Sequence, residues 1–505
     1  MQTHVRWRAS ASLTGTVLKW LSVPLILPLL LAFYYSERLL PLLLPMIITV
    51  IVGIVLERLD PNPKLGPAES FLMVGSTWLL VAGVGALPYI IAGNGTVAHP
   101  INALFESMSG FTTTGATVLG EISFERHSRS VLMWRQLTQW LGGMGIIVLG
   151  VAILSQLAVG GMQVMEAEAP GLRVEKLTPH IMGTARILWG LYAGITLGYM
   201  VVLYGLYLLG FAPNMNLYNA IAHGFTTLST GGFSPEARSI EAFSPVVQWV
   251  MIPFMIVAGT NFALLWHAVS GDLSQLWMNV EFKSYIGAIL GFCGLVTILL
   301  FTGVGIITPG DISGYAAVAF RQGLFQVVSI LTTTGYASAD FNNWTATAQY
   351  VLFLTMFIGG MAGSTAGCIK LFRWLIIFKS MKRELVTAIH PEVIQPVRIA
   401  GEVIDEDAIR GVYVFTLIYF VLFFAATLFI IEDSARAGLS LGGFESLSAT
   451  AATLGNIGPG FGIVGPMESY EPFPDSTKLL MVFLMWVGRL EIVPVLALFT
   501  PSFWR

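Results

Sequence analysis

Four short polar segments interrupt an otherwise apolar chain, and each of them contains glycine. They fall at 112–117, 229–232, 332–336 and 456–460. Their glycines, Gly115, Gly231, Gly335 and Gly458, are spaced by 116, 104 and 123 residues. Each segment lies between two apolar stretches that are long enough to cross a bilayer. This layout predicts four turns that meet around one ion pore.

The residue types in these turns suit one kind of ligand. A dehydrated alkali cation needs hard oxygen ligands without fixed negative charge, and rings of backbone carbonyls supply them. Glycine lets the backbone reach the dihedrals that turn carbonyls inward, and threonine hydroxyls can add ligands or brace the turn. None of the four turns contains Asp or Glu, which argues against a filter for divalent cations. The chemistry therefore fits K⁺ or Na⁺.

The composition indicates an integral membrane protein. Hydrophobic residues make up 55% of the 505 residues and charged residues only 11%, whereas soluble domains carry about 25% charged residues. Apolar runs of the length that spans a bilayer fall at 15–35, 39–57, 71–93, 131–159, 183–211, 245–270, 284–307, 346–378, 411–431 and 477–499. We therefore expect an all-α protein with ten spans.

Several other classes have little support. The first apolar run is followed at once by another and lacks a small-residue cleavage site, so it is not a removable signal peptide. Cys293 and Cys368 both lie in apolar runs, which leaves no basis for a disulfide framework or a cysteine metal site. A net charge of −3 gives no reason to expect a nucleic-acid partner.

The distribution of Lys and Arg predicts the orientation. If the four turns open to the outside, 17 Lys and Arg residues lie on the inner side and eight on the outer side. Because positive residues accumulate in cytoplasmic loops, we expect the turns to face outward and the N-terminus to lie inside.

The turns belong to an internal repeat. Intervals of about ten residues before each glycine (103–112, 218–228, 322–331 and 444–454) are too short to span but long enough for a half-membrane helix. Each unit then contains a span, a pore helix, a filter turn and a second span. Irregular backbone at membrane depth is tolerated only in protein or around a watery cavity, so four such turns should share one pseudo-four-fold axis. We expect an N-terminal two-helix extension at 1–66 and repeats at 67–165, 166–275, 276–385 and 386–505.

The ordered motifs TTTGAT, LSTGGF, TTTGYAS and GNIGPG resemble those of the TrkH/KtrB/HKT superfamily of K⁺ transport proteins. The two extra spans at 15–57 are most similar to the bacterial TrkH branch. By this resemblance, glycine at all four key positions implies K⁺ selectivity. The resemblance implies that the K⁺ ligands are the carbonyls of Thr113, Thr114, Gly115, Ser229, Thr230, Gly231, Thr333, Thr334, Gly335, Asn456, Ile457 and Gly458.

The resemblance also implies partners and a location. It implies a homodimer in the bacterial cytoplasmic (inner) membrane, docked on a cytosolic ring of nucleotide-binding TrkA-type subunits. The chain has no credible nucleotide-binding unit of its own, so a nucleotide (ATP/ADP or NAD) would act only through that partner. The basic stretch 370–410 is either a solvated loop at an anionic leaflet or the contact for such a partner.

Two features are candidates for a gate. Four glycines in nine residues (359–367) make a straight helix costly, which favours a loop over close packing of small residues. Arg489 places a charge at mid-membrane, either paired with a carboxylate or fixed at the constriction. In the resembled family such a loop obstructs the pore and the matching arginine raises the barrier to cations. The candidate gate residues are Gly359, Gly360, Gly363, Ser364, Thr365, Gly367 and Arg489.

Two alternatives remain open. A symporter that couples K⁺ to H⁺ or Na⁺ would need intramembrane carboxylates, for which Glu106, Glu445 and Glu491 are candidates. An intramembrane enzyme would need a nucleophile with a base or a metal cluster, but His223 and His267 lie far apart in the sequence and no hydrolase motif has suitable partners. No catalytic residue is expected.

Overall fold

The computed structural model describes residues 5–63, 65–156, 181–304, 314–392 and 395–504. Within these ranges the regular structure is helical apart from one two-stranded ladder. The distal ends of the expected spans 131–159 and 284–307, and the expected boundary between repeats at 165/166, lie outside the described residues.

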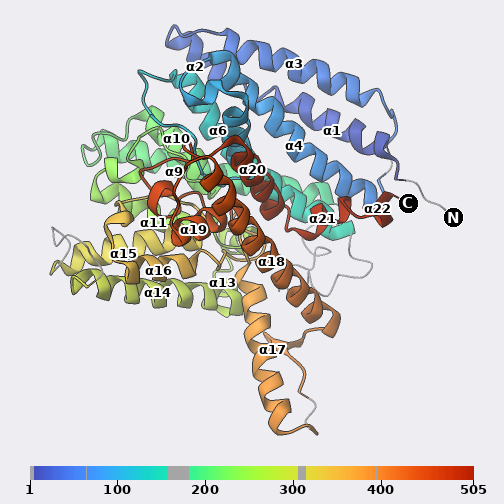
Figure 1. Cartoon of the computed structure of the whole chain (residues 1–505), viewed down its shortest axis with the longest axis vertical. Helices are drawn as coiled ribbons and strands as arrows, with labels where there is room; N and C mark the ends of the chain where they lie inside the picture. The colour runs from blue at the N-terminus through green and yellow to red at the C-terminus, as the bar shows by residue number, and fades with distance from the viewer. Residues whose placement is uncertain (1–4, 64, 157–180, 305–313, 393–394, 505) are drawn as a thin grey trace.

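The N-terminal extension packs along the first unit. It comprises α1 (Trp7–Leu21), α2 (Ile26–Tyr34) and α3 (Leu40–Glu57), of which α1 and α3 lie beside α4 (Pro67–Ala92) in Figure 1. Helices α1 and α3 approach closely, because a methyl group on Gly15 would lie 2.6 Å from the Gly53 carbonyl oxygen. Small residues permit such close helix contacts in membranes, and a Lys19–Glu57 ion pair of 2.7 Å adds to this one.

The structure confirms the four short helices that the repeat predicts. They are α5 (Pro100–Phe111), α10 (Leu217–Leu228), α15 (Ala316–Leu331) and α19 (Gly443–Leu454). Helix α15 begins six residues before the expected interval 322–331, so it is longer than the ten residues expected. Three of them begin with a recognisable signal or cap. Proline occupies the first position of α5, where its missing N–H costs nothing, and the Asn216 side chain accepts from the Asn219 N–H at the start of α10. At the start of α19 the Glu445 carboxylate accepts from the Gly442 N–H at 2.7 Å.

Each short helix lies between two longer segments. Those that precede it are α4, α9 (Ile181–Leu208), α14 (Val280–Phe301) and α18 (Glu406–Arg436). Those on its other side begin with α6 (Arg129–Gln156), α11 (Pro245–Ala258), α16 (Ala346–Thr355) and α20 (Asp475–Arg489). Short connections include α13 (Ser274–Met278) and the 3₁₀ turns η1 (Thr96–Ala98), η2 (Ser239–Ala242), η3 (Phe341–Asn343) and η4 (Gly462–Val464).

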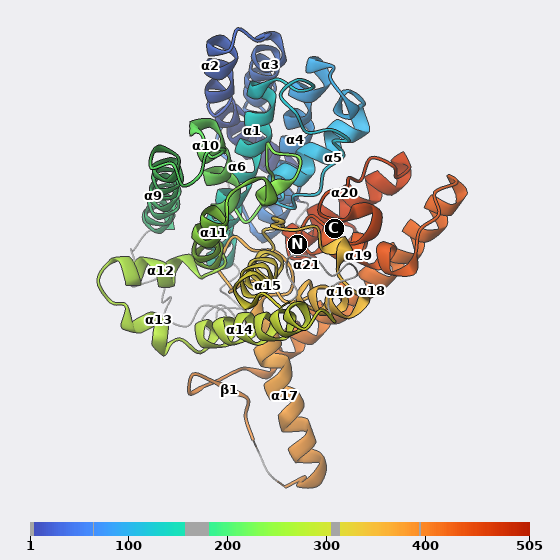
Figure 2. The same ribbon diagram turned by 90° about the vertical axis from the view of Figure 1, so that its left-hand side faces the viewer.

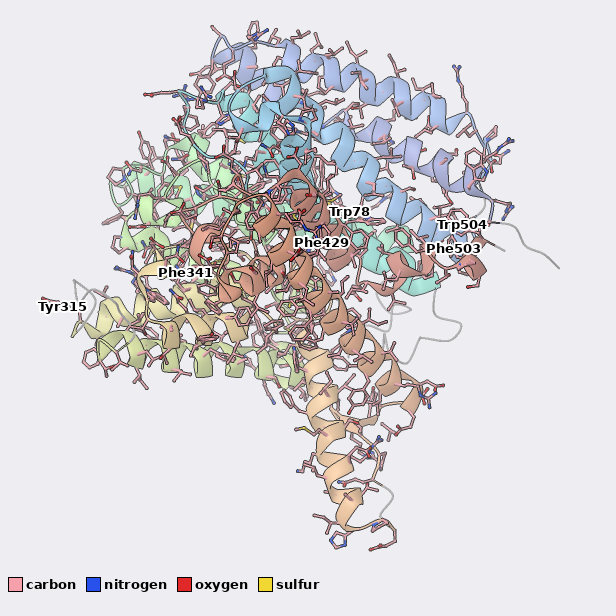
Figure 3. The ribbon with its side chains drawn as sticks, in the orientation of Figure 1. Trp78, Tyr315, Phe341, Phe429, Phe503 and Trp504 are labelled. Carbon is pink, nitrogen blue, oxygen red and sulfur yellow. The ribbon has the colours of Figure 1, made fainter. Side chains whose placement is uncertain are left out.

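Six of the expected spans are found as long apolar segments among the described residues. They are Trp7–Tyr34, Leu40–Glu57, Pro67–Ala92, Gly183–Leu208, Val280–Phe301 and Glu406–Arg436. Large apolar side chains on these segments are exposed, as lipid-facing residues are, and Tyr315 projects at the edge of the body in Figure 3. The chain is therefore a multi-pass membrane protein by composition and fold, while the full count of ten spans stays a prediction.

Two expected continuous spans are in fact broken. The span 245–270 bends by 108° between α11 and α12 (Phe262–Val269), because Asn261 accepts from the N–H groups of Ala263 and Leu264 and starts a new helix. The span 477–499 breaks between α20 and α21 (Val493–Leu498), where Glu491 and Ile492 have φ of 60° and 59°. The expected break in 346–378 is confirmed, since 356–370 separates α16 from α17 (Leu371–Ile389).

Helix α17 leads into an arm that leaves the main body, as Figures 1 and 2 show. Strands β1 (Arg398–Ile399) and β2 (Glu402–Val403) pair antiparallel and connect α17 to the start of α18. Arg383 forms an ion pair with Glu406, and Lys379 donates to the Arg398 carbonyl at 2.8 Å. The chain ends with α22 (Pro501–Trp504), where Phe503 and Trp504 lie together (Figure 3).

Candidate functional site

The four turns share one backbone conformation. In each, two residues separated by one position have positive φ, which is uncommon for any residue except glycine. The pairs are Thr113 (52°) and Gly115 (81°), Thr230 (53°) and Gly232 (76°), Thr333 (57°) and Gly335 (76°), and Asn456 (54°) and Gly458 (103°). The repeat that the sequence suggests is thus present in the backbone of all four turns.

The second turn begins one residue later than the sequence alignment predicts. The N–H of Gly231 donates to Thr226, just as that of Thr114 donates to Ser109. The glycine with positive φ is therefore Gly232, and Ser229 is the residue that ends α10. The expectation that Ser229, Thr230 and Gly231 match the other triplets was wrong by one position, because two consecutive glycines leave the alignment undetermined. The equivalent triplet is Thr230, Gly231 and Gly232.

The four turns form a closed ring. A methyl group on Gly115 would overlap the carbonyl oxygen of Gly231, and each later glycine meets the next turn in the same way. The remaining contacts are Gly232 with the Thr334 oxygen, Gly335 with the Ile457 oxygen, and Gly458 with the Thr114 oxygen at 2.7 Å. We call these four glycines and four carbonyls the turn ring. Its glycines are required for close packing as well as for their dihedrals.

Side chains hold this ring from behind. The hydroxyls of Thr112 and Thr114 lie 2.7 Å apart, as do those of Thr332 and Thr334. The Asn456 amide donates to the Thr114 hydroxyl at 2.9 Å and so ties the fourth turn to the first. Two further contacts were not predicted from the sequence. Gln139 donates to the Gly231 carbonyl of the second turn at 2.7 Å, and the Tyr470 hydroxyl donates to the Gly458 carbonyl of the fourth turn at 2.8 Å.

A buried ion pair lies behind the first and second turns. Glu106 and Arg135 are 0% and 2% exposed and lie 2.6 Å apart. The carboxylate also accepts from the Val118 N–H, and the guanidinium donates to the Ser234 carbonyl. The sequence named Glu106 as a candidate coupling carboxylate and did not single out Arg135. The signal for Arg135 was its position inside an expected span, where a charge is normally paired.

A cavity of about 250 Å³ opens beside the ring. Residues of all four turns line it, among them Gly115, Gly232, Gly335 and Gly458. The carboxylate residues Glu121, Glu236 and Glu468 also line it. Arg135 lines it as well, with its charge paired to Glu106. Carboxylates around a concave opening raise the local concentration of cations.

The glycine-rich segment 359–367 forms a loop that contacts the α11–α12 bend and the third turn. The Met361 N–H donates to the Gly259 carbonyl at 2.9 Å, and Asn261 donates to the Ala362 carbonyl at 2.8 Å. The Gly367 N–H donates to the Thr333 hydroxyl at 2.7 Å. The loop is thus anchored on the α11–α12 bend and on the third turn.

The remaining loop residues have clear positions. Gly363 has φ of 71° and its carbonyl accepts from the Phe262 N–H. Thr365 donates to the Ala258 and Leu228 carbonyls at 3.0 and 3.2 Å. The Ser364 hydroxyl bonds within the loop, to the Met361 carbonyl. Gly359 and Gly360 form the base of the loop, through backbone bonds to Ile369 and Leu371.

Arg489 reaches this loop from the end of α20. It is 3% exposed and donates through Nη1 to the Thr365 carbonyl at 2.7 Å. Its Nε and Nη2 have no hydrogen-bond partner among the described residues, and no carboxylate there forms an ion pair with it. The nearby Glu491 pairs with Arg373 at 2.5 Å instead. Within the described structure, Arg489 is therefore a buried cation in contact with the loop, and the carboxylate-pair alternative does not hold.

Lys370 lies just beyond the loop and its ammonium group donates to the Ala366 carbonyl. The sequence treated it as the first residue of the basic stretch 370–410, whereas the structure bonds it to the loop itself. Lys370 and Arg489 are therefore two basic side chains that contact the loop.

The fold and site together define a helical membrane protein with a ring of glycine turns at its centre. The chain belongs to the TrkH family, whose model, described as a cation transport protein, matches residues 43–505. This family is one of transport proteins and not of enzymes.

Known proteins are similar over the whole length. The Trk system potassium uptake protein TrkH of Salmonella typhimurium is 34% identical over 507 residues, covering 99% of this chain and 100% of that protein. The TrkG protein of the same system in Escherichia coli K12 is 32% identical over 497 residues, covering 97% of each chain. The crystal structure of the potassium transporter TrkH from Vibrio parahaemolyticus matches with a TM-score of 0.86 and 31% identity, covering 99% of this chain and 100% of that one.

Proposed function

We propose that this chain is a potassium uptake protein that conducts K⁺ through the turn ring. The observation that carries the proposal is the closure of the ring, in which each glycine packs against a carbonyl of the next turn. Carbonyl rings replace the hydration shell of K⁺ without binding it too tightly. The names of the relatives support the choice of ion, since each is a potassium uptake protein or potassium transporter.

In this proposal the ligands are the carbonyls of the revised triplets. They come from Thr113, Thr114 and Gly115; Thr230, Gly231 and Gly232; Thr333, Thr334 and Gly335; and Asn456, Ile457 and Gly458. The C-terminal ends of α5, α10, α15 and α19 lead directly into these turns. Helix C-termini carry partial negative charge, so they stabilise a cation on the inner side of the ring.

The gate in this proposal is the loop 359–367 together with Arg489. The loop is bonded to the third turn through Gly367 and to the break between α11 and α12. Arg489 adds a buried positive charge whose Nε and Nη2 have no partner in the described structure. An unscreened charge in a low-dielectric region opposes the passage of cations. Conduction would then require the loop and Arg489 to move apart.

We assign the chain to the bacterial cytoplasmic (inner) membrane, with ten spans, the N-terminus inside and the repeat limits expected from the sequence. It would act as a homodimer under control of a cytosolic TrkA-type nucleotide-binding ring. The arm formed by α17, β1, β2 and the start of α18 is the proposed contact, because it leaves the main body (Figure 2) and α17 begins directly after the loop. A movement of the arm would therefore pull on the loop.

Coupled symport has less support than passive conduction. Its three candidate carboxylates all have structural contacts: Glu106 pairs with Arg135, Glu445 caps α19, and Glu491 pairs with Arg373. A carboxylate that binds a coupling proton or Na⁺ has to change its partners during transport, which these contacts oppose.

The test is the reversal potential of purified protein in sealed vesicles, with flux measured in K⁺, Rb⁺, Na⁺ and Li⁺. Passive K⁺ conduction predicts a reversal potential that follows the K⁺ gradient alone, with Rb⁺ carried well and Na⁺ and Li⁺ poorly. A reversal potential that shifts with pH or with the Na⁺ gradient at constant K⁺ would favour the symporter instead.

A further inference from the structure

The second turn lacks a side chain that the other three turns possess. The residue before the ring glycine is Thr114, Thr334 or Ile457 in those turns but Gly231 in the second. In the first and third turns this threonine bonds to a neighbouring threonine hydroxyl at 2.7 Å and so holds its own turn. Two consecutive glycines have the greatest backbone freedom of any pair. The second turn therefore needs an external restraint.

Gln139 of α6 occupies the missing place. A methyl group on Gly231 would overlap the Gln139 amide, so this amide fills the volume where the other turns carry side chains. Gln139 is 0% exposed. It comes from the first unit, whereas the turn belongs to the second.

The amide uses both of its polar atoms on the turn. Its Nε2 donates to the Gly231 carbonyl at 2.7 Å, and its Oε1 accepts from the Phe233 N–H at 3.0 Å. These two contacts lie on either side of Gly232, so one side chain fixes the peptide groups before and after the ring glycine. Because donor and acceptor are both matched, the orientation of the amide is determined by its partners.

The carbonyl that Gln139 holds is a member of the turn ring. It is the oxygen against which Gly115 of the first turn packs. A rotation of this carbonyl would therefore disturb the contact between the first two turns as well as the second turn itself.

We propose that Gln139 is a positioning residue that determines ion selectivity by holding the second turn in place of its missing side chain. This inference rests on the proposed function, because it assumes that the turn ring discriminates between ions. Without the amide the Gly231 carbonyl can rotate, so the spacing of the ring carbonyls is no longer fixed and smaller cations are coordinated as well as K⁺.

The test compares Gln139→Met with Gln136→Met in purified protein in vesicles. Methionine matches glutamine in length but forms neither hydrogen bond, so packing is preserved. Gln136 lies one turn earlier on α6, is also 0% exposed, and its amide atoms have no partner among the described residues, which makes it a matched control. We expect Gln139→Met to lower the K⁺/Na⁺ permeability ratio about tenfold, the order of effect expected when its two buried hydrogen bonds are lost. Gln136→Met should leave the ratio unchanged.

A wild-type permeability ratio in Gln139→Met would overturn the proposal. Should that variant fail to fold, Gln139→Asn, whose shorter amide cannot keep both contacts, has to show a lowered ratio at normal thermal stability, and a wild-type ratio there refutes the proposal equally. Gly115→Ser, measured in parallel, distinguishes an error in the role of Gln139 from an error in the assignment of the turn ring as the filter. If Gly115→Ser loses selectivity and Gln139→Met does not, only the role of Gln139 is wrong; if neither changes selectivity, the turn ring is not the filter.

Discussion

The turn ring repeats one backbone geometry four times, whereas the adjoining layer, the backbone that follows each turn, differs between the four units. In the ring, one pair of positive φ values and one glycine–carbonyl contact occur four times. In the adjoining layer the four units differ: α6 is continuous, α11 and α12 bend by 108°, residues 356–370 form a loop, and α20 ends at Arg489. In the proposed function, four similar turns serve as the filter, and the unequal backbone next to them would place the gate at one loop and one cation.

The adjoining layer still retains traces of the repeat. A methyl group on Gly142 would overlap the Phe111 carbonyl at the end of α5, and one on Gly488 would overlap the Leu454 carbonyl at the end of α19. Glycine at this depth lets the second helix of a unit approach its short helix. The first and fourth units therefore share this packing and differ in the course of the backbone after these glycines.

The largest effect should come from breaking the ring itself. Gly232→Ala forces a Cβ into the Thr334 carbonyl and places alanine at φ of 76°, so we expect loss of K⁺ uptake by cells that depend on this protein. Gly231→Ala should retain more uptake but lose selectivity, because the atoms nearest its Cβ belong to the Gln139 side chain, which can be displaced at a lower cost than a backbone carbonyl. Gly194→Ala, with no heavy atom within 4 Å of its Cβ, is the control. Greater loss in Gly231→Ala than in Gly232→Ala would contradict the revised alignment of the second turn.

The next effect concerns the support of the ring. Glu106→Gln leaves Arg135 buried without its carboxylate, which should cost about 3–5 kcal/mol and lower the melting temperature of the purified protein. Glu57→Gln breaks the more exposed Lys19–Glu57 ion pair and should lower the melting temperature much less, because water screens an exposed pair. Equal melting temperatures for the two variants would show that the Glu106–Arg135 pair does not support the fold.

In the adjoining layer, Arg489→Ala should raise the basal K⁺ flux several-fold in the absence of any cytosolic partner. It removes both the buried charge and the bond to the Thr365 carbonyl. Arg489→Lys, which keeps the charge, should stay closer to the wild type. Flux of ⁸⁶Rb⁺ into vesicles measures both, and an unchanged flux in Arg489→Ala would return this residue to a purely structural role.

The smallest effect should come from loosening the loop at one hydroxyl. Thr365→Val removes the bonds to the Ala258 and Leu228 carbonyls, each worth about 1 kcal/mol. We expect a basal flux above wild type but below that of Arg489→Ala. Ser364→Ala is the control, since its hydroxyl bonds only within the loop. Flux in Thr365→Val no higher than in Ser364→Ala would exclude these bonds from the restraint on the loop.

The sequence predicted features that depend on length and local composition. The four short helices are expected from intervals of about ten residues before each glycine, and the loop is expected from four glycines in nine residues. Both are local properties, because half a bilayer limits the helix length and glycine makes a helix costly. Six of the expected spans were identified by hydropathy for the same reason.

Features that depend on distant contacts were missed. The choice between Gly231 and Gly232 is made by the hydrogen bond to Thr226 and by packing against Thr334. Gln139 lies 92 positions before the carbonyl that it holds. The break after Arg489 places Ile492, a β-branched residue, at positive φ, which no local preference favours. Such features are determined by tertiary contacts that a single sequence does not contain.

The central claim, that the turn ring discriminates between ions, is tested most directly by the K⁺/Na⁺ permeability ratio of Gly115→Ser in vesicles. The serine Cβ would overlap the Gly231 carbonyl at a position where φ is 81°, so the first two turns must separate. We predict a ratio well below that of the wild type. A wild-type ratio in this variant would contradict the assignment of the four turns as the filter.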